Sequence, residues 1–163
     1  MIDKKNIENS TVVRIQKDIF NKKNLLNQEE IRVYSALIKA INELDISGLV
    51  NINSQVNLSA FISSNNVAYR DFNKLSVDFL ITSKKTAEPL FAIEYHGGGH
   101  YGDTEVEALK VENRDLIKLN IFTKINLPFE IICNSELDNI VEFCKKKLED
   151  FANYYKEHLG GDK

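Results

Sequence analysis

Two acidic residues, Asp78 and Glu94, lie in neighbouring segments where apolar and polar residues alternate as they do in β-strands. The two strands are expected over residues 75–81 and 90–95, and a turn symmetric about Thr86 would place Asp78 directly opposite Glu94. Facing carboxylates with Cβ atoms roughly 4.5–5.5 Å apart repel each other. A hard cation such as Mg²⁺, which prefers one or two carboxylates plus waters, would offset that repulsion. The alternative is that both carboxylates lie on a solvated face of the sheet.

A histidine and a glycine-rich turn follow Glu94 directly in the chain. His96 is two residues further on, so strand alternation points its side chain to the same side as the Glu94 carboxylate. The turn Gly97-Gly98-Gly99 either lets the backbone approach a phosphate closely or only supplies the positive φ angles of a sharp exit from the strand. A zinc pair of His96 and His100 is disfavoured, because the two histidines are expected on a strand and a loop.

Two cations follow on the next predicted helix, which covers about residues 103–126. Arg114 and Lys118 are four residues apart, so they share one helix face and could clamp phosphates. The alternative for Arg114 is an ion pair with Asp115 or Glu112. These side chains are therefore candidates for nucleic-acid binding.

The elements that must position these residues can be predicted from hydrophobic periodicity. Asn27 and Glu30 form an N-cap and capping-box pattern at the start of a helix that continues to about Leu44. Further elements are a short helix within 12–20, strands over 49–58, 75–81, 90–95 and 129–133, a helix over 103–126 and a last helix capped by Ser135. Because a helix leads to the fourth strand, this order predicts an α/β fold with a mixed four-stranded sheet flanked by helices.

Composition limits the classes of protein to which the chain could belong. With 163 residues and 43% apolar residues it is long and apolar enough for one folded domain, expected over residues 26–160 after an extension over residues 1–25. No apolar run suits a membrane helix or a secretory signal, so the expected compartment is the cytoplasm, with no membrane partner. The net charge of −3 means that any binding of a polyanion must come from a local patch.

The residues above resemble a known group of nucleases, the PD-(D/E)XK restriction-endonuclease-like superfamily, and more narrowly its very-short-patch-repair-like branch. The resemblance lies in Asp78-Phe79, Phe91-Ala92-Ile93-Glu94, the glycine-rich turn ending in His100, and Arg114-Asp115-Leu116-Ile117-Lys118 before Leu127-Pro128-Phe129. It covers about residues 26–133 and implies a restriction-endonuclease-like core in the order α-β-β-β-α-β-α.

The resemblance also implies roles for single residues. Asp78 and Glu94 match the carboxylates that bind the metal and position the attacking water. The third motif position, usually Lys or an acid, is His96 here, which leaves His96 as base or ligand, or Lys118 as the charge that stabilises the scissile phosphate. Glu30 resembles an accessory acid near a second metal, although its capping-box role is favoured. His100 matches the histidine that closes the family's glycine-rich turn, and its alternative is a loop histidine bonded to backbone.

Together these observations favour a nuclease that uses Mg²⁺ or Mn²⁺ to hydrolyse phosphodiester bonds in nucleic acid, with DNA as the favoured substrate. The alternative is a catalytically degenerate endonuclease-like fold that only binds nucleic acid or a protein partner. A homodimer and additional domains both stay open as expectations.

Overall fold

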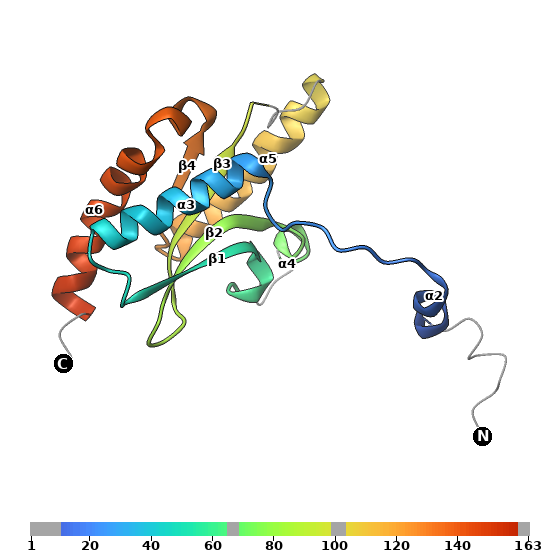
Figure 1. Cartoon of the computed structure of the whole chain (residues 1–163). Helices are drawn as coiled ribbons and strands as arrows, with labels where there is room; N and C mark the ends of the chain where they lie inside the picture. Colours follow the sequence, from blue (N-terminus) through green and yellow to red (C-terminus); the bar gives the residue numbers. More distant parts are fainter. Residues whose placement is uncertain (1–10, 65–68, 99–103, 160–163) are drawn as a thin grey trace.

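A computed structural model describes residues 11–64, 69–98 and 104–159 of the chain (Figure 1). Its elements are α2 (Thr11–Lys17), α3 (Gln28–Glu43), β1 (Val50–Asn57), η1 (Leu58–Ala60), α4 (Tyr69–Phe72), β2 (Ser76–Ser83), β3 (Pro89–His96), α5 (Glu105–Lys124), β4 (Phe129–Cys133), η2 (Asn134–Asn139) and α6 (Ile140–Leu159). The η elements are short 3₁₀ helices.

The four strands form one mixed sheet in the order β1-β2-β3-β4. The pairs β1–β2 and β2–β3 are antiparallel, whereas β3 and β4 are parallel and are joined through α5. The fold is therefore α/β, with a four-stranded mixed sheet flanked by helices, as the sequence predicts.

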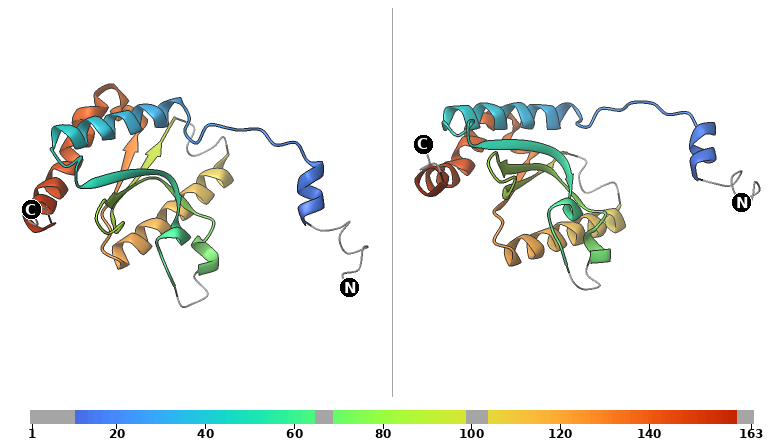
Figure 2. Two further views of the ribbon diagram at one scale, coloured as in Figure 1. Left: turned by 60° about the horizontal axis from the view of Figure 1, so that its bottom comes forward. Right: turned by 90° about the horizontal axis from the view of Figure 1, so that it is seen from below.

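Helices cover both faces of the sheet (Figure 2). On one face, apolar side chains of α3 and α6, such as Leu37 and Leu148, pack against Phe79 and Ile93. On the other face, Phe122 of α5 packs with apolar residues of η1, α4 and β2. Because β2 and β3 are covered on both sides, their side chains are mostly buried on both faces.

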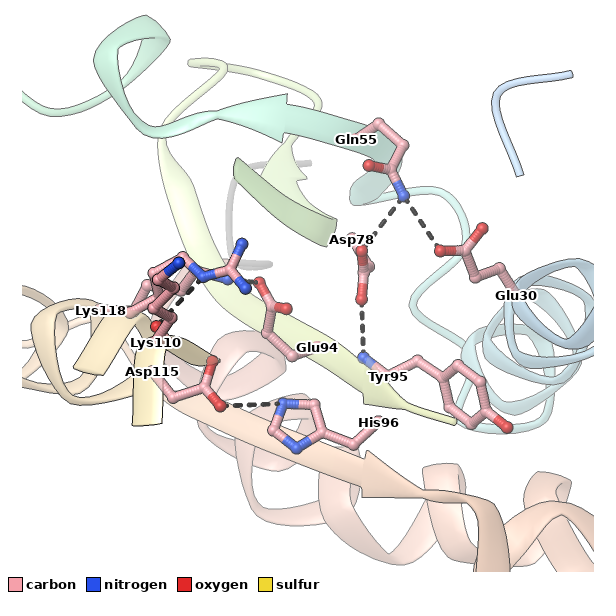
Figure 3. A network of polar contacts seen from close by, with 10 residues as sticks. Glu30, Gln55, Asp78, Glu94, Tyr95, His96, Lys110, Asp115 and Lys118 are labelled. Atoms are coloured by element: carbon pink, nitrogen blue, oxygen red, sulfur yellow. Dashed lines mark hydrogen bonds and ion pairs between the residues drawn. The ribbon is translucent and has the colours of Figure 1, made fainter. Parts of the chain in front are cut away.

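The helix α3 begins with the predicted capping box. The Asn27 side-chain oxygen accepts from the Glu30 N–H at 2.9 Å, and a Glu30 carboxylate oxygen accepts from the Asn27 N–H at 2.7 Å. Both bonds satisfy N–H groups that the first turn leaves without helical partners. The box thereby fixes the start of α3 close to the first residues of β2 and the last residues of β3 (Figure 3).

The predicted register between β2 and β3 is confirmed. Phe79 pairs with Ile93, Leu80 with Ala92, and the register shifts only beyond Ile81. The paired residues begin at Phe79 and Ile93, which directly neighbour Asp78 and Glu94 in the chain.

Only a narrow strip of α5 contacts the sheet, so Val106, Leu109 and Leu116 are more than half exposed. One local prediction is wrong. Ser135 does not cap the last helix. It lies inside η2, where the Glu136 carboxylate accepts from the Cys133 N–H at 2.8 Å, and α6 starts only at Ile140.

Within the described ranges, no helix combines the length and the apolar character that crossing a membrane requires.

Candidate functional site

The two predicted carboxylates lie in one cleft where β2 and β3 approach the start of α3 (Figure 3). The volume of this cleft is about 360 Å³. Its described lining consists of Asn27, Glu29, Glu30, Asp78, Glu94, Tyr95, Gly97 and Gly98. Four of these eight residues are acidic, so the cleft is suited to a cation.

Asp78 is held by two hydrogen bonds. Its Oδ2 accepts from the Tyr95 backbone N–H at 2.8 Å, and its Oδ1 accepts from the Gln55 side-chain amide at 3.1 Å. The carboxylate of Asp78 thus takes a backbone donor of the neighbouring strand, which fixes its position against β3.

Gln55 is a site residue that the sequence analysis missed. It stands across from Asp78, between the register pairs Ser54–Phe79 and Val56–Val77, with a φ of 54°. Its amide donates to Asp78 and, at 3.4 Å, to Glu30 Oε1, so one side chain links two carboxylates from two elements. A lone glutamine in a strand belongs to no motif, and its left-handed backbone has no sequence signal either.

Glu94 forms a buried ion pair with Lys118 of α5. The Lys118 Nζ lies 2.6 Å from Glu94 Oε1, and the two residues are only 7% and 4% exposed. Burial, followed by the negative charge of Asp78, raises the pKa of Glu94 to about 7, although Lys118 acts in the opposite direction. Close to neutral pH, Glu94 can therefore change its ionisation.

His96 is buried on the α5 side of β3. Its Nε2 lies 3.6 Å from Asp115 Oδ2, and only 6% of the residue is exposed. Figure 3 shows its ring next to Asp115, and His96 is not one of the residues that line the cleft. Among the described contacts, then, His96 joins β3 to α5.

A second polar contact lies on the other side of β3. The Tyr95 hydroxyl donates to Glu29 Oε2 at 3.0 Å and also lies 3.1 Å from Asn134 Oδ1. Burial, followed by the bond to Glu29, raises the pKa of Tyr95 to about 12, so the phenol stays protonated. Gly97 passes so close that a Cβ there would lie 2.9 Å from Glu29 Oε2. Sequence reasoning placed neither Glu29 nor Tyr95 in the site.

The other predicted residues fall in different places. Glu30 closes the predicted capping box and also lines the cleft. Gly97 and Gly98 line the cleft as well. Arg114 is exposed on α5, where its Nε donates to the Lys110 carbonyl oxygen at 3.3 Å. His100 lies outside the residues that the structure describes.

The donor set of the cleft fits a hard cation. Within the described ranges, no three or more His, Cys, Asp and Glu side chains form a group that could hold a metal ion. Mg²⁺, however, is commonly bound through one or two carboxylates and several waters. Asp78 and Glu94 supply two carboxylates and no sulfur or nitrogen ligand, which fits Mg²⁺ or Mn²⁺ better than zinc.

Fold and site together define an α/β protein with an acidic cleft at one end of a mixed sheet. Residues 22–150 match the family described as "Protein of unknown function (DUF2726)", and the chain belongs to this family. A search of curated proteins and a search of solved structures gave no significant match.

Proposed function

We propose that this protein is a metal-dependent nuclease of the restriction-endonuclease-like type, acting on DNA. The observation that carries the proposal is the 2.6 Å contact of Lys118 Nζ with Glu94 next to Asp78. The third motif position, where a lysine or an acid is usual, holds His96. Lys118 brings an ammonium group to the same carboxylate from α5, so the site contains two carboxylates and a lysine after all.

The element order supports this proposal. The described chain runs α3, β1, β2, β3, α5, β4 and α6, which is the order that the resemblance implies, with four additional short helices, α2, η1, α4 and η2. Asp78 and Glu94 come from the adjacent antiparallel strands β2 and β3, also as expected.

Each residue of the site would have a distinct task. Asp78 and Glu94 would hold Mg²⁺ or Mn²⁺, which when bound activates water and neutralises phosphate charge. Lys118 favours the ionised form of Glu94 and adds positive charge at the site. Gln55 and the Tyr95 N–H orient the Asp78 carboxylate.

A binding module is the second candidate, and one observation favours it. The ammonium of Lys118 already compensates the charge of Glu94, so this buried pair is satisfied with no cation present. A fold that had lost catalysis could retain the pair for structure alone.

Cleavage assays separate the two candidates. Plasmid, linear duplex and single-stranded DNA are incubated with the protein and Mg²⁺, Mn²⁺ or EDTA. The parent should cleave with a cation and not with EDTA, and Asp78→Asn or Glu94→Gln should lower the rate by about 10²-fold or more. Lys118→Met should lower the rate by about 10²–10³-fold with little loss of DNA affinity.

The matched control is Asp150→Asn, which removes one exposed carboxylate from α6. Its cleavage rate should equal that of the parent. If the parent binds DNA and cleaves no substrate with either cation, the binding module is correct and the nuclease proposal is wrong.

A further inference from the structure

The segment of residues 11–26, here called the arm, extends away from the folded domain (Figures 1 and 2). It consists of α2 and the chain that leads from α2 to α3. Large apolar side chains stay exposed along it: Ile15 is 53% exposed, Ile19 85% and Phe20 68%. None of these three side chains belongs to either apolar cluster of the domain, so the domain core does not hold the arm in place.

The charge of the arm is opposite to that of the domain. The arm carries the exposed basic residues Arg14, Lys17, Lys22 and Lys23 and one acid, Asp18, for a charge of +3. Residues 27–163 carry 15 basic and 21 acidic residues, for a charge of −6. A basic arm on an acidic domain is typical of segments that bind nucleic acid.

The arm also begins at the edge of the candidate site. It joins α3 at Asn27, which caps this helix and lines the cleft together with Glu29 and Glu30. A nucleic acid with a phosphate in the cleft would therefore pass close to the base of the arm.

We infer that the arm binds the phosphate backbone of the same DNA duplex whose scissile phosphate enters the cleft. This inference rests on the proposed function for the position of that phosphate. The acidic cleft and the negative domain repel a polyanion, and the arm supplies up to four cations that offset the repulsion. The arm thus serves as the principal contact for affinity, and the cleft carries out the chemistry.

The length of the arm limits where it can bind. Residues 18–27 join α2 to α3 without regular secondary structure. Ten extended residues span at most about 33–36 Å, which corresponds to about ten base pairs of duplex at 3.4 Å each. The arm can therefore reach phosphates up to about one helical turn beyond the cleaved bond, and duplexes that end nearer the cleft offer it fewer phosphates.

Binding of duplex DNA without divalent cations tests the inference independently of cleavage. The arm variant carries Arg14→Gln, Lys17→Gln, Lys22→Gln and Lys23→Gln in the full chain. Log K falls linearly with log salt, and each phosphate contact makes this slope steeper by about 0.9. On a duplex of about 40 base pairs, the slope of the arm variant should therefore be shallower than that of the parent by up to about 3.6. Affinity should fall at least about tenfold at low salt.

The matched control removes four exposed lysines elsewhere through Lys39→Gln, Lys85→Gln, Lys146→Gln and Lys156→Gln. It changes the net charge equally and should retain most of the affinity and slope of the parent. On a duplex of about 8 base pairs, too short for domain and arm together, the ratio of parent to arm-variant affinity should fall toward one.

Three results would overturn the inference. The first is an equal loss of DNA affinity in the control and the arm variant, and the second is an arm effect that does not depend on duplex length. The third is arm-dependent binding to phosphatidylserine vesicles and not to DNA. Its failure can be distinguished from failure of the nuclease proposal. Cleavage with no arm effect would remove only the arm's role, whereas arm-dependent binding without any cleavage would support the arm and remove the nuclease.

Discussion

Gln55 and Glu94 both occupy states in the candidate site that cost free energy. Gln55 has a left-handed backbone inside a strand, and Glu94 is a carboxylate buried beside another carboxylate. Residues with positive φ other than glycine are uncommon and cluster at functional sites. Both residues contact or adjoin Asp78, so these two unfavourable states meet where we place the chemistry.

The strain at Gln55 predicts an inverted order of stability for two substitutions. Gln55→Ala and Gln55→Gly both lose the bonds to Asp78 and Glu30, but only glycine adopts a φ of 54° without strain. Gln55→Gly should therefore be more stable than Gln55→Ala by about 1 kcal/mol in urea unfolding. Ser54 provides the control, because its φ is not positive. At this position Ser54→Gly should be less stable than Ser54→Ala. A Gln55→Gly variant no more stable than Gln55→Ala would contradict this explanation.

At the scale of elements, two polar pairs connect β3 to α5. Glu94 and His96, two residues apart on the strand, face Lys118 and Asp115, three residues apart on the helix. The two-residue repeat of a strand and the three- to four-residue repeat of a helix make this double contact possible. It sets the rotation of α5 about its axis and brings Lys118 inward, and the apolar residues Leu109 and Leu116 then face outward.

This arrangement predicts that His96 positions α5 and does not act as the general base. His96→Gln and Asp115→Asn should each lower the cleavage rate by a similar factor without changing its pH profile. In a double-mutant cycle, their effects on the free energy of unfolding should be coupled by about 0.5–1 kcal/mol. Glu112→Gln, an exposed change on the same helix, serves as the control. If His96→Gln alone lowers the cleavage rate by about 10²–10⁴-fold and alters its pH profile, His96 is the general base.

At the scale of the whole molecule, charge is distributed unevenly. Helices cover both faces of the sheet (Figure 2). Asn27, the residue at which the arm joins α3, lines the acidic cleft. Repulsion among the carboxylates of the cleft makes the stability of the whole fold depend on pH and on bound cations.

The raised pKa of Glu94 predicts the sign of this dependence. In the unfolded chain Glu94 ionises near 4.5 and in the folded protein near 7, so between these values the folded state holds more protons. The contribution of Glu94 to stability is therefore complete below about pH 4.5 and is lost as the pH rises through about 7. The free energy of unfolding of the parent, relative to Glu94→Gln, should decline over this interval and level off above it.

Mn²⁺ should counteract this decline, because a cation binds the ionised carboxylates of the folded state. At a concentration about 100-fold above its Kd it should add about 2.7 kcal/mol, and its effect on Tm should grow as the pH rises through 7. Asp78→Asn should melt higher than the parent without metal and lose the response to Mn²⁺. A parent whose melting curve does not change with millimolar Mn²⁺ would mean that the cleft holds no cation.

Local patterns in the sequence were sufficient for most of the fold and for the two central carboxylates. The period of two in β2 and β3 and a short turn determine the register that pairs Phe79 with Ile93, next to the two carboxylates. Asn27 with Glu30 determines the start of α3. These features depend on neighbours within one hairpin or one helical turn, and such short-range rules can be read from residue order.

Only the tertiary structure decided how the elements meet at the site. The contact of Lys118 with Glu94, the burial of His96 beside Asp115 and the left-handed backbone of Gln55 all depend on the rotation and approach of separate elements. Packing over the whole sheet determines these quantities, and residue order does not encode them locally. For this reason the sequence identified Lys118 as a candidate cation, and only the fold showed which carboxylate it contacts.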